Sequence, residues 1–236
     1  YIRLDLLYRY DIIEITNITE EATGDLKKEF GKNIISSMEL GFTYDSRDNI
    51  FNPTKGDVLS GSFQVAGGPL GADKDFLKLF GTASHYWGLF RGSTLEFRGR
   101  IGLADAYGDS DTLPIYERYF AGGAYTIRGY HERRVGPIDP VSKDPLGGES
   151  MLVGNIEYIY PVLDIFKLAA FYDIGNVWSK LEELGSGGLK SGFGFGVRIK
   201  TPIGPVLLDY GIPLNKEPGE EKIGSGRFHF SMSRGF

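Results

Sequence analysis

The chain has 236 residues and no cysteine, which excludes disulfides, zinc ribbons and thiolate chemistry. Its formal net charge of −5 provides no basic surface, so DNA and RNA are not expected as partners. The 34 glycines, 14 tyrosines and 16 phenylalanines favour one all-β domain over a helical one. No apolar run approaches the roughly 20 residues of a membrane-spanning helix. The chain begins with alternating residues rather than a basic and then apolar segment, so any signal peptide is expected upstream.

Apolar and polar residues alternate with a period of two along ten segments, which is the pattern of strands with one apolar face. In segment 93–105, Phe97 and Leu103 lie on one face, and Arg98 and Arg100 lie on the other. The predicted strands, in chain order, are 2–15, 35–45, 57–66, 76–87, 93–105, 151–160, 167–178, 190–200, 205–213 and 226–236. Most are close to the roughly 9 to 11 residues of a tilted strand that spans a membrane.

The connections between these segments favour a membrane barrel over a soluble sandwich. Alternation alone leaves both open, because either lipid or a protein core covers the apolar faces. The connections after the fourth, sixth and eighth segments are tight turns, as at the periplasmic end of an outer-membrane barrel. Charges on the opposite faces also suit a wet lumen: Arg98, Arg100, Glu157, Asp173, Arg198 and Asp209. We therefore predict that residues 1–236 form a transmembrane antiparallel up-and-down β-barrel, with the odd-numbered connections outside the cell.

The segment at about 106–150, between the fifth and sixth strands, is too long for an ordinary loop. Its centre holds aromatics, paired glycines and Arg128 between apolar residues. If the segment folds into the lumen, Arg128 needs carboxylates to offset its desolvation, and Glu157 and Asp173 lie on inward faces of the next two strands. The alternative is an ordinary surface arginine. The alternate glycines of 192–196 lie on one strand face, where they make room for a segment against the inner wall.

Sequence motifs for catalysis are absent: the chain has no G-x-S-x-G elbow, no H-E-x-x-H pair, no Walker loop and no dinucleotide fingerprint. His85, His131 and His229 are far apart in the sequence and are expected to be structural or solvated rather than metal ligands. We therefore expect no catalytic residue, no cofactor and no metal, and the chain is not expected to be an enzyme.

At the long segment the sequence resembles the BamA-type outer-membrane protein assembly factors, within the surface-antigen and POTRA-transporter superfamily. The V/I-R-G-F/Y motif of the family's inward-folded loop reads here Ile127-Arg128-Gly129-Tyr130. The likeness extends in the family's order over about residues 35 to 236. It includes the segments 49–56, 120–123, 155–158, 173–178 and 201–205.

This resemblance implies that Arg128 pairs with Glu157 and Asp173 and pins the loop to the barrel wall. It also implies that the last strand carries the signal by which such barrels are recognised for insertion and forms one side of a seam that opens sideways. The residues of that signal are Phe228, Phe230, Met232 and Phe236. The family barrel has sixteen strands and follows POTRA domains, whereas ten segments and no POTRA pattern are found here. We therefore expect a partial barrel that closes with further strands or by self-association with another copy.

The implied function is insertion and assembly of outer-membrane proteins in a Gram-negative bacterium. Nascent β-barrel proteins, outer-membrane lipids and accessory lipoproteins are the implied partners. Two alternatives stay open: a related protein-secretion transporter that shares the loop motif, and a passive barrel fragment without activity.

Overall fold

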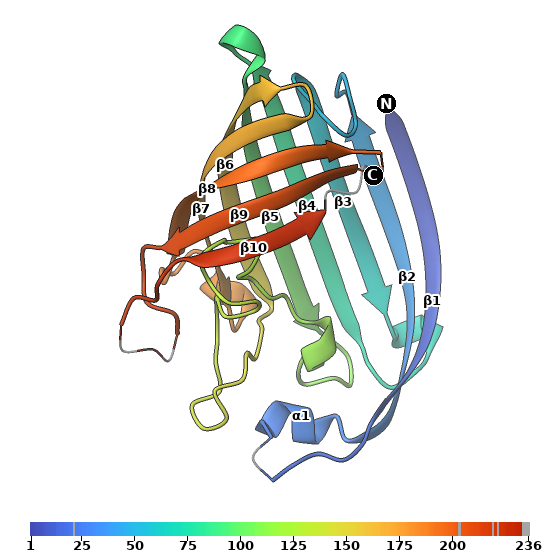
Figure 1. Ribbon diagram of the computed structural model, residues 1–236. Coiled ribbons are helices and arrows are strands. Elements are labelled where there is room, and N and C mark those ends of the chain that lie inside the picture. The colour runs from blue at the N-terminus through green and yellow to red at the C-terminus, as the bar shows by residue number, and fades with distance from the viewer. Residues whose placement is uncertain (21, 203, 219, 221, 233–236) are drawn as a thin grey trace.

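The computed structural model describes residues 1–20, 22–202, 204–218, 220 and 222–232. Ten strands form one antiparallel sheet in chain order, and the sheet curls around an interior (Figure 1). The strands are β1 (Ile2–Ile15), β2 (Gly31–Asp45), β3 (Gly56–Ala66), β4 (Phe76–Gly88), β5 (Thr94–Ala106), β6 (Ser150–Leu163), β7 (Phe166–Trp178), β8 (Lys190–Thr201), β9 (Gly204–Pro213) and β10 (Arg227–Met232). The predicted fold class, an antiparallel all-β partial barrel, is confirmed, and no pairing between β1 and β10 is seen in the described residues.

Short helices occupy several connections. They are α1 (Gly24–Lys28) and the 3₁₀ turns η1 (Gly68–Leu70), η2 (Phe90–Gly92), η3 (Ile115–Glu117) and η4 (Leu181–Glu183). Among the described residues, no helix is long and apolar enough to span a membrane. Within the described residues, the predicted strands agree with the observed ones to within a few residues, and the largest difference is at the start of β2. The predicted part of the last strand at 233–236 lies outside the described residues. Strand β2 begins at Gly31 instead of 35, because Gly31 already pairs with Ile15 and the register with β1 continues unbroken from there.

The apolar side chains of the strands point outward and the charged ones point inward. On β5 the outward Phe97 is 40% exposed, whereas the neighbouring inward Glu96 is 8% exposed. The same holds on other strands, where Leu40 and Leu79 are exposed and Asp173 is buried. A soluble sandwich has the opposite arrangement, with its apolar faces in the core. The apolar outer face is therefore suited to lipid and the polar inner face to a wet lumen.

The odd-numbered connections gather at one end of the sheet, the lower end in Figure 1, and the even-numbered turns lie at the other. At the lower end the interior is filled by a hydrophobic cluster of inward strand residues and residues of the long β5–β6 loop. The cluster comprises Ile35, Ala66, Phe76, Ala104, Met151, Val153 and Val177 from strands, with Leu113, Tyr119, Ala121, Ile127, Tyr130 and Val135 from the loop. Toward the other end, the interior contains a cavity of about 1400 Å³ that is lined by polar and charged residues together with apolar ones.

Candidate functional site in the barrel interior

Much of the long loop between β5 and β6 folds back inside the curved sheet, while a later part of it, drawn in yellow, extends below the sheet (Figure 1). Its course is set by isolated bridges between Tyr119 and Gly148 and between Ala121 and Val135. Gly122 lies at the turn with a φ of +103°, a backbone conformation that side chains disfavour. The hydroxyl Oγ1 of Thr126 accepts from the Gly122 amide at 2.8 Å and closes the turn. The following residues, 127–130, are thereby directed at the wall formed by β6 to β10.

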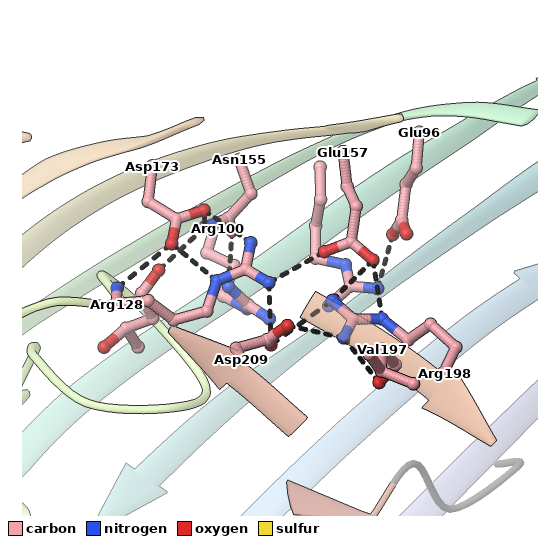
Figure 2. A network of polar contacts seen from close by, with 11 residues as sticks. Glu96, Arg100, Arg128, Asn155, Glu157, Asp173, Val197, Arg198 and Asp209 are labelled. Carbon is pink, nitrogen blue, oxygen red and sulfur yellow. Dashed lines mark hydrogen bonds and ion pairs between the residues drawn. The ribbon is translucent and has the colours of Figure 1, made fainter. Parts of the chain in front are cut away.

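Arg128 lies at the centre of this contact and its side chain is 8% exposed (Figure 2). Its Nε and Nη2 donate to the two carboxylate oxygens of Asp173 at 2.7 and 2.8 Å, which is the bidentate geometry of a guanidinium and a carboxylate. Its Nη1 donates to Glu157 at 2.8 Å and to Asp209 at 3.1 Å. The structure therefore places Arg128 against both carboxylates expected from the sequence and against a third from β9.

A second arginine from the barrel wall completes the charge balance of this network. Arg198 on β8 bonds to Glu157 at 2.8 Å and to Asp209 at 2.5 Å, so each of these carboxylates lies between two guanidinium groups. Arg100 joins through Asn155, which in turn donates to Asp173 at 2.8 Å. Three arginines thus face three carboxylates, which is the condition under which buried charges are tolerated.

The wall beside Arg128 is shaped to receive the loop. The guanidinium carbon lies 3.4 Å from the centre of the Phe171 ring, a cation–π contact in a desolvated site. The glycines of β8 and β9 make room for the loop backbone: a Cβ on Gly192 would lie 2.3 Å from the Arg128 carbonyl oxygen, and one on Gly211 would lie 2.5 Å from the Gly129 nitrogen. The sequence prediction that the glycines of 192–196 accommodate a packed segment is confirmed at Gly192.

The rest of the Ile127 to Tyr130 motif is also fixed. Gly129 has a φ of +96°, and its amide donates to Nε2 of His229 on β10 at 2.9 Å. Tyr130 is fully buried, and its hydroxyl donates to the Ser191 carbonyl at 2.8 Å. Ile127 belongs to the hydrophobic cluster. Every residue of the motif therefore contacts the wall or the core.

Three of the four predicted seam residues lie on β10, apart from this network. Phe228 is 86% exposed on the outer face, where its ring lies 4.8 Å from that of Tyr210, and Phe230 is also exposed. Met232 pairs with Val206 of β9 at the end of the described strand. Phe236, the fourth seam residue predicted from the sequence, lies outside the described residues.

The sequence reasoning missed several contributors to the site. Asp209 and Arg198 were expected to point inward, but no signal in the sequence assigned them to Arg128 or its partners. His229 was expected to be structural or solvated, and its contact with the Gly129 amide joins residues 100 positions apart. Alternation predicts the direction of a side chain but not its partner across the lumen. Within the described residues, no group of three His, Asp or Glu side chains is arranged to hold a metal ion.

Comparisons with known proteins identify the family. Residues 1–236 match the Omp85 superfamily domain. The chain is 36% identical, over 97% of its length, to the outer membrane protein assembly factor BamA of Nitratidesulfovibrio vulgaris, and covers 29% of that protein. It is 27% identical, over 89% of its length, to a SAM50-like protein of Schizosaccharomyces pombe, and covers 46% of it. The chain therefore spans less than half the length of these curated relatives.

A solved structure supports the fold. BamA from Haemophilus ducreyi lacking POTRA domains 1–3 superposes with a TM-score of 0.73 at 20% identity, over 96% of this chain and 50% of that one. The relative from Nitratidesulfovibrio vulgaris is named as an assembly factor and not as an enzyme. With the apolar outer face, these matches place the chain in the bacterial outer membrane as part of a β-barrel. Because the family domain is matched along the whole chain, the chain belongs to the Omp85 superfamily.

Proposed function

We propose that this chain is the membrane barrel of an outer-membrane protein assembly factor, in which the docked loop holds the lumen in shape while β10 offers an edge to incoming strands. The observation that carries the proposal is the Arg128 network, which joins the loop to β6, β7 and β9 in a chain whose relatives include BamA. A guanidinium stays charged at any physiological pH, so this network acts as a permanent clamp rather than a proton-transfer site.

The outer edge of β10 supplies the second element of the proposal. β10 pairs with β9 along residues 227–232, and no strand is paired with its other edge in the described part of the chain. An unpaired strand edge presents amide and carbonyl groups that bind an extended segment by β-augmentation. Phe228 and Phe230 lie on the outer face of that edge. We infer that they belong to the seam at which a nascent β-barrel protein pairs and enters the lipid.

The partners follow from this function and are part of the proposal. They are nascent outer-membrane β-barrel proteins and the surrounding lipids. Accessory lipoproteins and self-association that completes the barrel stay predictions from the family resemblance. The separate domain that 1–236 is expected to form would then be the membrane unit of a longer assembly protein.

Replacing Arg128 tests the function directly. Arg128→Ala removes one partner of a buried charge network and leaves three carboxylates short of a cation, a change that costs about 3 to 5 kcal/mol in buried ion pairs. In cells that depend on the full-length protein, we expect steady-state levels of a test porin to fall severalfold. The matched control is Arg134→Ala, which removes the same charge from the same loop but, among the described residues, breaks a side-chain bond only to the Lys143 carbonyl.

The outcomes also separate the alternatives. Unchanged porin levels with the variant present in the membrane at normal amounts would refute the assembly role of the loop. Normal porin levels together with loss of one exported protein would favour a secretion transporter. A variant without effect on either process would indicate a passive barrel.

A further inference from the structure

The long loop has a second set of contacts, on the side of the barrel opposite to Arg128. Glu117 in η3 is buried, with 8% of its side chain exposed. It accepts from Nη2 of Arg9 on β1 at 2.7 Å and from Nζ of Lys78 on β4 at 2.8 Å. Arg9 is also 2.7 Å from Asp11 on its own strand. One buried carboxylate of the loop thus bridges two cations from strands that do not neighbour each other in the sheet.

Neighbouring loop residues reinforce this contact. The Tyr119 hydroxyl donates to the Leu79 carbonyl on β4 at 2.9 Å. Arg118 donates to Asp25 of α1 at 2.8 Å, and Tyr116 donates to Glu29 at 3.3 Å. Burial raises the pKa of Asp25, but Arg118 and Lys28 outweigh it and lower that pKa below its ordinary value, so the carboxylate is ionised at neutral pH. The β1–β2 connection therefore also holds the loop.

The two sets of contacts lie at opposite sides of the lumen. Arg128 is bound by strands β6, β7 and β9, and Glu117 is bound by β1 and β4. The sheet order separates β1 from β9 by seven strands, and β1 is not paired with β10 in the described residues. The loop therefore connects strands near the two ends of the sheet directly, in addition to the hydrogen bonds between neighbouring strands.

We propose that Glu117 is a positioning residue that makes the loop a strut across the lumen, fixing the spacing between the first and the last strands of this sheet. The wall anchor is Arg128, bound to β6, β7 and β9, and the outer anchor is Glu117, bound to β1 and β4. The loop fixes the spacing between these strands only when both anchors are bound. A carboxylate shared by two cations suits this role, because neutralising it leaves two like charges facing each other and releases β1 and β4 together.

Hydrogen exchange measured by mass spectrometry on the full-length protein in lipid nanodiscs tests the outer anchor. In Glu117→Gln, which keeps the shape of the side chain and removes its charge, we expect amides of 113–121 to exchange about tenfold faster, and those of 2–15 to lose protection as well. Amides of 126–131 should keep their protection. The control is Glu132→Gln in the same loop, a glutamate on the exposed side of the loop.

A double variant distinguishes a specific contact between Glu117 and Arg9 from a general loss of packing. Arg9→Gln alone should also accelerate exchange in 113–121. Added to Glu117→Gln it should accelerate exchange no further, because the contact is already lost and the repulsion between Arg9 and Lys78 is removed. Additive effects of the two changes, or unaltered exchange of 113–121 in Glu117→Gln, would overturn the proposal. If Glu117→Gln does not accumulate, Lys78→Met weakens the same anchor from the wall side and gives the same two outcomes. The readout is protection and not porin assembly, so its failure leaves the proposed function standing.

Discussion

The loop fits against the barrel wall because one residue, Arg128, has a long charged side chain and because two wall residues, Gly192 and Gly211, have none. Arg128 needs its guanidinium to reach three carboxylates, since five N–H donors in a fixed plane serve several acceptors at once and an ammonium group does not. Gly192 and Gly211 need to be bare because the loop backbone lies where a Cβ would be. Docking of the loop therefore requires both the charge of Arg128 and the space left by these two glycines.

Gly192→Ala should displace the loop without touching a charge. The added Cβ would meet the Arg128 carbonyl oxygen at 2.3 Å, and both atoms belong to backbones that move only together with their neighbours. We expect a loss of about 1 to 3 kcal/mol in the free energy of unfolding, measured by urea titration in lipid vesicles, with faster protease cleavage inside 126–131. Gly99→Ala is the control, because a Cβ there meets nothing within 4 Å. Equal midpoints for the two variants would contradict this account of β8.

At the scale of elements, the turn between β2 and β3 is organised largely by the carboxylate of Asp48. Asp48 accepts from the Thr54 and Lys55 amides at 2.8 and 3.2 Å and also from the Thr54 hydroxyl. Farther along the same turn, Asn52 bonds to Lys167 at the start of β7. The turn thereby extends across its own end of the interior and is attached to the far wall.

Asp48→Ala should detach this turn from β7. Loss of the three bonds removes a large part of the turn's internal support, although the bonds from the Phe51 and Asn52 amides to the Asn49 side chain stay. We expect a cost of about 1 to 2 kcal/mol together with higher accessibility of Lys167. Reaction of the Lys167 amine with an acylating reagent, followed by peptide mass spectrometry, measures the second effect. Asp164→Ala in the β6–β7 turn is a control. Identical labelling of Lys167 in the Asp48 variant and in the unaltered protein would refute the attachment.

The strands could be predicted from the sequence because lipid and lumen impose opposite demands on successive residues. The adjacent Phe97 and Arg98, one apolar and one charged, are an example of this alternation. The start of β2 and the helix α1 could not be predicted in this way, because residues 16–34 carry no repeating contrast. The inward direction of Asp209 followed from alternation, but its contact with Arg128 depends on a loop 81 residues away. Glu117 was not predicted at all, because a loop has no alternating sequence pattern that would distinguish a buried carboxylate from a solvated one.

At the scale of the whole molecule, the chain is a sheet in which each strand pairs with its neighbours in sequence, crossed by a loop that pairs with distant strands. Strand pairing is local and forms early, whereas contacts of high sequence separation carry a larger entropic cost. The Arg128 network needs carboxylates from β6, β7 and β9, and the Gly129 amide needs His229 from β10. The loop therefore docks only on a nearly complete wall.

Refolding into lipid vesicles tests this order. With pulsed hydrogen exchange, the Gly129 amide should become protected no earlier than the amides of β10, because its acceptor, Nε2 of His229, arrives with that strand. Protection in β4 and β5 should precede both. Protection of Gly129 while β10 still exchanges freely would show that the loop docks without the last strand.

The bond between Gly129 and His229 has a consequence for the proposed seam. His229 points inward from the same short strand whose outer face carries Phe228 and Phe230. Any partner that pulls β10 away from its position also withdraws the acceptor of the Gly129 amide, so events at the membrane edge and events in the lumen are thermodynamically coupled. Such coupling is reciprocal: a molecule that tightens the loop from inside also makes the last strand harder to displace from outside. The barrel interior would then respond to engagement of its edge through a single imidazole on the inward face of that strand.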